Sequence, residues 1–365
     1  MYEKMGTNET IKTIADEILN EPVVAITSRT FETPSHDPHD YVSRAPYWYV
    51  EADGTVVRKD GQINPESKLN SDKDTMLRAR NNVMFLTVAA LETQATGDNP
   101  SAAAYAEYVE RTLKTWFVDE ATRMNPNLEY AQMKPKETTG NFYGIIEGDA
   151  LMRFVEVTVA LENKGLLKDP ETATGVKDWF EKYLNWLENS DKGKREKVMA
   201  NNHSTFYAAQ VAQVADFVGD REAVVGALEY AKALIDRQVA EDGSMPEELK
   251  RHEGGVGYDY QLFNLYGFIK LAEISEKYGA DLDLWHYKSS KGVGLEDAFE
   301  YFVKKELPKA GEHPFKMDRT GELYLTFRAA AKAYNNEGYY DLPAKYFTNE
   351  LADRLTSSDT EVWMH

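Results

Sequence analysis

Residues 74–100 read DTMLRARNNVMFLTVAALETQATGDNP, and this stretch contains the pattern that governs most of the chain. Its apolar residues recur at helical spacing, among them Leu77, Met84 and Val88. A helix is therefore predicted over 74–96, with Asp74 as its N-cap. Gly97 ends this helix, because glycine readily adopts the conformation that follows a helix C-terminus. Pro100 opens the next helix, since proline is tolerated in a first helical turn.

Further pairs of predicted helices follow along the chain. Short joints, such as the one at 97–99, require neighbouring helices to run antiparallel. About five helical hairpins in succession predict an all-α fold, either an α/α toroid or a helical solenoid, and we expect the toroid, as an incomplete barrel. The further predicted pairs are 149–163 with 174–187, 204–218 with 220–240, 258–278 with 295–306, and 320–334 with 343–355.

The first 73 residues have a different character. Residues 31–66 are rich in Pro, Asp, His, Tyr and Gly and read as a long ordered loop. Flexible linkers seldom carry aromatic residues, whereas this loop contains Tyr41, Tyr47, Trp48 and Tyr49. Loops of this length inside compact domains are often lids or binding loops. We predict an N-terminal extension with a lid-like loop over 1–73 and a catalytic toroid, as one structural unit, over 74–365.

The balance of charge excludes several classes of function. The 365 residues include 42 Lys+Arg and 61 Asp+Glu, which gives a formal charge of -19. Nucleic-acid binding needs a basic face, so no nucleic-acid partner is expected. No stretch approaches the roughly 20 consecutive apolar residues that a membrane span needs, so no membrane partner is expected either. The absence of cysteine excludes disulfides, thiolate nucleophiles and Cys-ligated metal sites.

Aromatic residues make up 12% of the chain, and Tyr outnumbers Phe by 22 to 15. Flat amphipathic rings suit a sugar-binding cleft, because they pack against a pyranose and hydrogen-bond to it. Ordinary packing between helices explains the same composition, and composition alone favours this explanation.

Two polar segments stand out from the helical pattern. The first is ANNHSTFY at 200–207, whose Asn and Ser residues also suit helix N-caps. The second is GSMPEELKRH at 243–252, followed by GGVGYDY at 254–260, which also suits a charged surface loop. Each precedes or begins a predicted helix, so a toroid can bring both to the same rim.

These segments carry a family resemblance. Asn202-His203, then MPEELKR at 245–251, then Tyr258 resemble the alginate lyase superfamily of polysaccharide lyases. The blocks HDYVS at 39–43, PYW at 46–48 and RKDGQINPE at 58–66 resemble the N-terminal part of its branch with glucuronan and alginate lyases. Tyr130-Ala131-Gln132 and GIIE at 144–147 are also similar to family blocks. The resemblance implies a catalytic set of Asn202, His203, Arg251 and Tyr258, with Tyr258 as base and then acid, and catalysis without a metal or cofactor.

The chemistry of uronan cleavage suits these residue types. A lyase removes the C5 proton beside the sugar carboxylate and expels the C4 oxygen, which leaves a C4=C5 double bond. The carboxylate resists a second negative charge, so Asn202 and Arg251 are suitable donors to neutralise it. Tyr258 has an unperturbed pKa near 10, and a neighbouring cation such as Arg251 favours its phenolate. His203 can assist as a second base or as a neutral hydrogen-bond partner.

One residue can act as both base and acid when the C5 hydrogen and the C4 oxygen share a ring face. Mannuronate and glucuronate have that arrangement and differ only at C2. We therefore expect a β-1,4-linked uronan, mannuronate-rich alginate or glucuronan, as the substrate and partner. Six residues are candidates for binding this substrate: Tyr47, Trp48, Arg58, Gln132, Lys250 and Tyr260. Ordinary packing or solvation also explains each of them.

The compartment follows from the expected substrate. Residues 1–20 show no apolar stretch typical of a secretory signal. Because polymers are degraded outside the cytoplasm, we expect a secreted or periplasmic protein in its mature form. A cytoplasmic enzyme acting on oligosaccharides is the alternative.

Three other interpretations compete. A metal site at HDPHD, 36–40, has suitable ligand types but lacks helical ligand spacing and contains Pro38, so no metal is expected. A glycoside hydrolase with paired carboxylates, such as Glu247 and Glu248, is a second function. A non-catalytic helical protein that binds oligosaccharide is a third.

Overall fold

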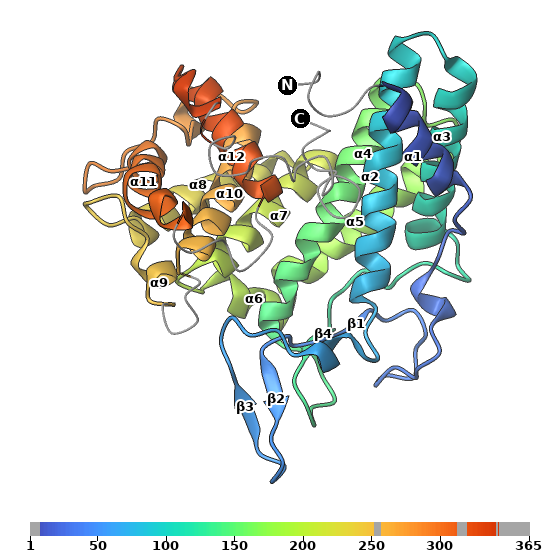
Figure 1. The fold of residues 1–365 in the computed structure, drawn as a ribbon, viewed down its shortest axis with the longest axis horizontal. Coiled ribbons are helices and arrows are strands. Elements are labelled where there is room, and N and C mark those ends of the chain that lie inside the picture. Colours follow the sequence, from blue (N-terminus) through green and yellow to red (C-terminus); the bar gives the residue numbers. More distant parts are fainter. Residues whose placement is uncertain (1–7, 252–256, 312–319, 341, 343–365) are drawn as a thin grey trace. The chain divides into compact units, whose positions relative to one another are not determined.

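The computed structural model describes residues 8–251, 257–311, 320–340 and 342 (Figure 1). Their contacts divide the chain into two compact units. Unit 1 contains the described residues up to Ala45 together with Pro65–Leu187, and unit 2 contains Pro46–Asn64 and the described residues from Glu188 onward. The division expected from the sequence, at residues 73 and 74, stays a prediction.

Unit 1 consists of helices and one short strand pair. Helix α2 packs against α1, α3 and α4, and strand β1 pairs in parallel with β4. Its elements are α1 Asn8–Leu19, β1 Val42–Arg44, α2 Lys73–Ala95, α3 Asn99–Leu113, β4 Tyr130–Met133, α4 Asp149–Asn163 and α5 Pro170–Asn189, of which the last two residues belong to unit 2. A π-helix spans Lys114–Val118, and 3-10 helices span Ile26–Ser28, Pro65–Lys68 and Phe142–Gly148.

The aromatic core of unit 1 centres on Phe117. Its ring centroid lies 5.1 Å from that of Phe154 and 4.8 Å from that of Trp179, both in edge-on geometry. All three side chains are buried. Edge-on pairs of this kind add about 0.5–1.5 kcal/mol each beyond their burial, so this cluster joins the π-helix to α4 and α5.

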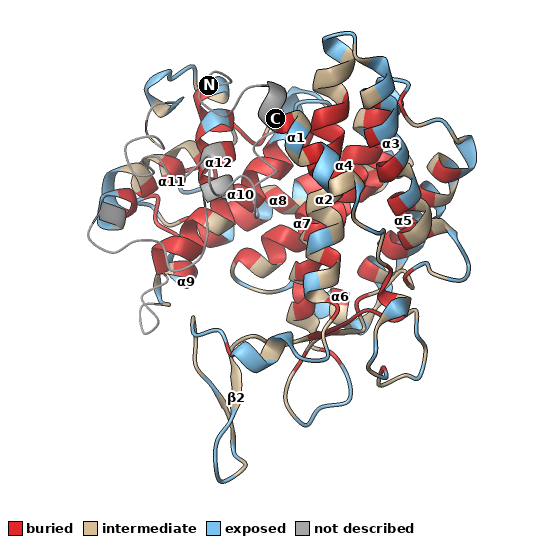
Figure 2. Cartoon of the chain, turned by 45° about the vertical axis from the view of Figure 1, so that its right-hand side comes forward, coloured by how far each residue is buried: buried red, intermediate tan, exposed pale blue. Residues whose placement is uncertain are grey.

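Unit 2 is organised around α10, Gly257–Ser275, which packs against α7 and α12. Nearly all of α10 is buried, as Figure 2 shows in red, and a helix buried all round lies in a core. The other elements are β2 Trp48–Val50, β3 Val56–Arg58, α6 Asp191–Lys197, α7 Asn202–Val218, α8 Arg221–Gln238, α9 Pro246–Leu249, α11 Leu295–Tyr301 and α12 Thr320–Ala333. A π-helix spans Phe302–Glu306, and 3-10 helices span Ala280–Leu282 and Leu307–Gly311.

Most predicted helices are confirmed within a few residues. The helix predicted over 149–163 is α4, with the same bounds. The helix predicted from 204 begins at Asn202, which places Asn202 and His203 in its first turn. The helix predicted over 343–355 lies outside the described residues.

Three details of the sequence-based prediction were wrong. The N-cap position of α2 is held by Asp72, not by Asp74. The helix expected over 295–306 is α-helical only to Tyr301 and continues as a π-helix. Strands β1 to β4 were not predicted, because strands of three or four residues are too short to show alternation. Helix α1 was not predicted either.

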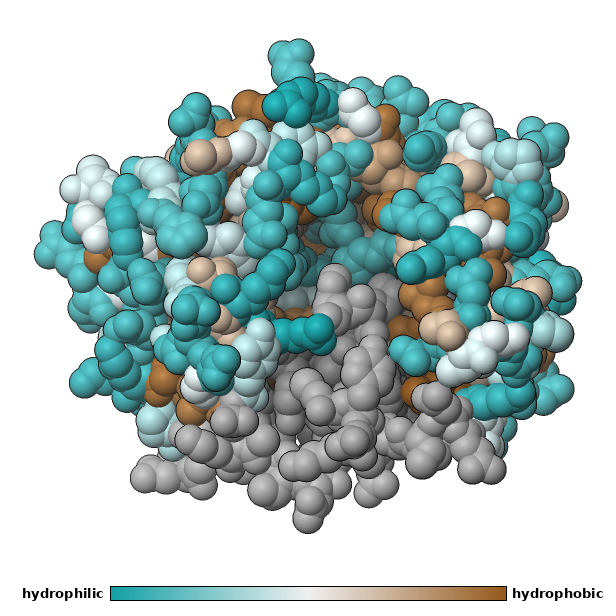
Figure 3. All heavy atoms as spheres, turned by 90° about the horizontal axis from the view of Figure 1, so that it is seen from above, coloured by the Kyte–Doolittle hydropathy of each residue, from teal (hydrophilic) through white to brown (hydrophobic). Residues whose placement is uncertain are grey.

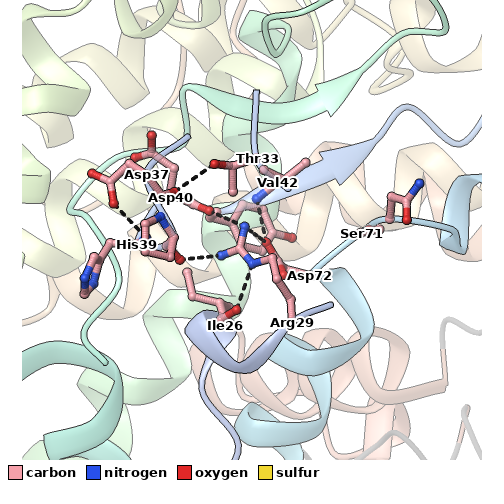
Figure 4. A network of polar contacts seen from close by, with 12 residues as sticks. Ile26, Arg29, Thr33, Asp37, His39, Asp40, Val42, Ser71 and Asp72 are labelled. Carbon is pink, nitrogen blue, oxygen red and sulfur yellow. Dashed lines mark hydrogen bonds and ion pairs between the residues drawn. The ribbon is translucent and has the colours of Figure 1, made fainter. Parts of the chain in front are cut away.

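Asp72 does not cap α2 with its side chain because it belongs to a buried network (Figure 4). Its carboxylate accepts from the backbone N–H of Val42 at 2.8 Å and pairs with Arg29 at 3.1 Å. Arg29 also donates to the carbonyls of Ile26 and Asp40. Burial raises the pKa of Asp72 to about 6, although Arg29 and the Val42 N–H act in the opposite direction. One ion pair thus joins the N-terminal loop to the start of α2.

The segment 36–40, which invited a metal interpretation, lies beside this network. Within the described ranges, no group of three or more His, Asp and Glu side chains is arranged to hold a metal ion. The polar side chains of the segment contact protein atoms: His36 contacts Glu32, His39 contacts the carbonyl oxygen of Arg123, and Asp37 and Asp40 both accept from Asn125.

The surface agrees with the acidic, polar composition. The face shown in Figure 3 is mostly hydrophilic, and its hydrophobic residues form small scattered patches. Of the helices that the structure describes, none combines the length and the apolar character needed to cross a membrane.

Two glycines give a matched test of the packing. A Cβ at Gly144 would lie 2.6 Å from the carbonyl oxygen of Ala131, whereas a Cβ at Gly226 in α8 would meet no atom within 4 Å. We expect Gly144→Ala to lower the free energy of unfolding by about 1–3 kcal/mol, because backbone must move. Gly226→Ala should raise it by about 0.5–1 kcal/mol through helix propensity. Urea denaturation measures both, and equal shifts would contradict this account.

Candidate active site

The N-terminus of α7 is held by a carboxylate from another helix. Asn202, the first residue of α7, is completely buried. Its backbone N–H donates to Oε1 of Glu248 at 2.6 Å, and its Nδ2 donates to Oε1 at 3.0 Å and to Oε2 at 2.8 Å. An acid group at a helix N-terminus satisfies an otherwise unpaired N–H and interacts favourably with the helix dipole. Glu248 therefore fixes both the backbone and the side chain of Asn202.

Glu248 lies in α9, a one-turn helix with Pro246 in its first turn. Its side chain is completely buried. Burial raises the pKa of Glu248 to about 7, although the hydrogen bonds from Asn202 and the charges of Arg251 and His203 act to lower it. The carboxyl group is therefore balanced between its two protonation states near neutral pH. The sequence analysis considered Glu248 only as half of a carboxylate pair and missed this role.

His203 follows in the same turn and also contacts a buried carboxylate. Its Nδ1 lies 2.6 Å from Oε1 of Glu196 in α6. Glu196 is completely buried, and burial raises its pKa although His203 opposes the shift. A carboxylate bonded to one ring nitrogen fixes the orientation of the imidazole and directs the other nitrogen away.

Arg251, which follows α9, contacts a third carboxylate. Its Nε donates to Oδ2 of Asp60 at 3.0 Å and its Nη2 donates to Oδ1 at 2.6 Å, a two-pronged contact. Its guanidinium carbon lies 3.4 Å from the centroid of the Tyr260 ring in α10. Burial acts to lower the pKa of Arg251, but Asp60 and Tyr260 outweigh it and the net shift is upward. Arg251 is thus a fixed positive charge, and the Nη1 edge of its guanidinium points away from Asp60.

Tyr258 is the second residue of α10 and is 7% exposed. Burial, followed by the nearby charge of Asp259, raises the pKa of Tyr258 to about 12. The sequence analysis expected a neighbouring cation to favour the phenolate, whereas the net shift of the Tyr258 pKa is upward. Arg251 stacks instead on Tyr260, two residues further along the chain.

The four residues predicted as the catalytic set all lie in unit 2 and are linked through their neighbours. Glu248 ties α9 to the start of α7, and Arg251 ties the end of α9 to the first turn of α10. Asn202, His203, Arg251 and Tyr258 therefore gather where α7 and α10 begin and α9 ends. The catalytic role of these four residues stays a prediction.

Five of the six predicted binding residues also belong to unit 2. The hydroxyl groups of Tyr47 and Tyr260 lie 2.8 Å apart. Strands β2 and β3, side by side in Figure 1, pair Trp48 with Arg58, which in turn donates to Asp60 at 2.8 Å. Lys250 is exposed and pairs with Glu247.

Gln132 lies in β4 of unit 1, with a backbone φ of 49° and its N–H bonded to Ser43 Oγ at 2.8 Å. A positive φ is uncommon for a residue other than glycine. The role of Gln132 in binding stays a prediction.

The carboxylate pair of the hydrolase interpretation is not supported by this geometry. Glu247 is exposed and pairs with Lys250, whereas Glu248 is buried against Asn202. Two acid groups that act on one glycosidic bond must face the same cleft. Successive residues on a helix turn point in different directions, as these two do.

Solved structures are similar to this fold over nearly its whole length. An alginate lyase from Bacteroides ovatus matches with a TM-score of 0.80 at 25% identity, covering 96% of this chain and 92% of its own. Alginate lyase A1-III from Sphingomonas species A1 matches with a TM-score of 0.53 at 15% identity, covering 97% and 94%. A variant of alginate lyase A1-III complexed with a tetrasaccharide gives 0.54 at 16% identity, covering 98% and 94%.

These likenesses confirm the predicted fold class, an all-α toroid of helical hairpins. No curated protein sequence matches the chain. The family described as alginate lyase matches residues 25–310. Because this match covers most of the 365 residues, the chain belongs to the alginate lyase family of polysaccharide lyases.

Proposed function

We propose that this protein cleaves a β-1,4-linked uronan, mannuronate-rich alginate or glucuronan, by β-elimination. The product carries a C4=C5 double bond at its new non-reducing end. Asn202 and Arg251 neutralise the sugar carboxylate, and Tyr258 moves the proton. A protein with this substrate acts where the polymer is, so we also propose a secreted or periplasmic location.

The observation that carries the proposal is the grouping of an amide, a guanidinium and a phenol within unit 2. Asn202 and Arg251 are both held by carboxylates of the chain, so their positions are set before any substrate binds. Donors fixed in advance stabilise developing charge more effectively than mobile ones. The tetrasaccharide complex of the A1-III variant is consistent with a carbohydrate ligand for this fold.

In the proposed reaction, one residue acts first as general base and then as general acid. The Tyr258 phenolate removes the C5 hydrogen, and the electrons of that C–H bond form the C4=C5 double bond as the C4–O bond breaks. The new phenol then gives its proton to the departing oxygen and returns to phenolate. A pKa of about 12 keeps Tyr258 protonated at neutral pH, so the phenolate is a minor form whose fraction rises with pH.

A panel of polymers tests the function. Polymannuronate, polyguluronate, glucuronan and hyaluronan are incubated separately with the protein, and the ultraviolet absorbance of the alkene is followed. We expect alkene from polymannuronate or glucuronan, where the C5 hydrogen and C4 oxygen share a ring face. New reducing ends without alkene would indicate hydrolysis, and no product from any polymer would refute catalysis.

The Tyr258→Phe variant tests the proton carrier. Removal of one hydroxyl should lower kcat on the preferred polymer by at least about 10³-fold, while binding measured by calorimetry stays within a few-fold. The control is Tyr340→Phe, which alters a tyrosine that is 48% exposed. A Tyr258→Phe variant with near-normal kcat would exclude Tyr258 as base and acid.

Asp60 supplies a test of how Arg251 is held. Asp60→Asn leaves one acceptor oxygen for three guanidinium donors, two from Arg251 and one from Arg58, so Arg251 loses its fixed orientation. We expect kcat/KM to fall about 10–100-fold, as is typical when the partner of a reacting group is removed. Asp53→Asn is the matched control, because Asp53 is exposed between β2 and β3 and accepts from the backbone N–H of Thr55. Equal effects from the two variants would show that Asp60 does not act through Arg251.

A further inference from the structure

The hydrogen bonds of the Asn202 side chain do not suit its proposed role, which is to neutralise the sugar carboxylate. Its Nδ2 donates to both oxygens of Glu248, and its Oδ1 has no hydrogen-bond partner among the described residues. An amide oxygen is an acceptor, and so is an ionised sugar carboxylate. In this orientation Oδ1 repels the acid group that Asn202 is to neutralise.

Turning the amide by half a rotation about its Cβ–Cγ bond removes the conflict. Oxygen and NH₂ have nearly the same volume, so the two orientations fill the same space. The turned amide places Oδ1 against Glu248, and an ionised Glu248 repels it. A protonated Glu248 instead donates its O–H to Oδ1, while its other oxygen keeps the backbone N–H of Asn202.

We propose that Glu248 is a positioning residue whose protonation turns the Asn202 amide, so that NH₂ faces the sugar acid group in the active form. The inference rests on the function proposed above. One proton is taken up from solvent by Glu248, and no other covalent bond changes. Glu248 itself does not touch the substrate.

The surroundings of Glu248 allow both forms near neutral pH. Its pKa is raised to about 7 by burial, while Asn202, Arg251 and His203 act to lower it. Helix α10, which packs against α9, has Tyr258 and the buried Asp259 in its first turn. A bound uronate brings another negative charge, which favours the protonated form of Glu248.

This coupling predicts an unusual pH profile. The active form needs Tyr258 as phenolate and Glu248 as neutral acid, whose pKa values are about 12 and about 7. Below pH 7 the phenolate fraction rises about tenfold per pH unit while Glu248 stays protonated. Above pH 7 the loss of protonated Glu248 cancels that rise. The rate should therefore climb to about pH 7 and then level off.

Glu248→Gln separates this role from a purely structural one. The glutamine NH₂ donates to Oδ1 of Asn202 permanently, and its oxygen still accepts the backbone N–H. We expect the rate of Glu248→Gln to rise about 100-fold between pH 7 and pH 9, whereas that of the unaltered protein changes less than about threefold. The control is Glu247→Gln, which neutralises an exposed acid on the same helix turn. Profiles of the same shape in all three proteins would overturn the proposal.

A second measurement does not depend on catalysis. In protein labelled with ¹⁵N-asparagine, the side-chain NH₂ signals of Asn202 are assigned by their loss in Asn202→Ala. We expect these signals to shift between pH 6 and pH 8 and to stay constant in Glu248→Gln. Signals that are constant in the unaltered protein from pH 5 to pH 9 would overturn the proposal even if Glu248→Gln does not fold.

The two proposals can fail separately. If the Asn202 signals shift with pH but no polymer gives alkene, the proposed function is refuted, and the link between Glu248 protonation and the Asn202 amide still stands.

Discussion

The contact between Glu248 and Asn202 is the interaction on which the rest of the site depends. Helix α9 has only four residues, too few to be stable by its own hydrogen bonds. Its position is set because Glu248 receives three hydrogen bonds from the first residue of a 17-residue helix. Arg251 follows two residues after α9 ends, so its place is set by the same contact. A single buried acid thus aligns the amide and the guanidinium.

Each of three predicted catalytic residues has a carboxylate partner of its own. Asn202 contacts Glu248, His203 contacts Glu196, and Arg251 contacts Asp60. This arrangement orients the donors, but in the proposed function it would also bring three acids close to an anionic sugar, in a chain whose formal charge is already -19. Burial raises the pKa of Glu248 and of Glu196, so protonation of buried acids is the least costly way to reduce the repulsion. Asp60 differs, because its pair with Arg251 outweighs burial and its pKa is lowered.

The sequence predicted the helices, but it did not predict the carboxylate partners of the candidate site residues. Helix α4 was predicted to the residue because its apolar positions repeat and polar residues mark both ends. The partners follow from folding alone: Asp60 lies 191 residues from Arg251, and Glu248 lies 46 residues from Asn202. Local pattern carries no information about such distant pairs. The upward pKa shift of Tyr258 was missed for a related reason, because burial depends on all of the elements that surround α10.

Under the proposed function, the choice between mannuronate and glucuronate would lie outside the four predicted catalytic residues, since the two sugars present the same C4, C5 and carboxylate geometry. A single inverted hydroxyl at C2 is best sensed by neutral groups that both donate and accept. The hydroxyl pair of Tyr47 and Tyr260 has that property, because either hydroxyl can be the donor across their 2.8 Å contact. Arg251 also stacks on the ring of Tyr260, so a sugar bound by the guanidinium, as proposed, would lie beside this pair. In the proposed reaction, recognition and charge neutralisation would share one aromatic ring, and a change at Tyr260 would alter both together.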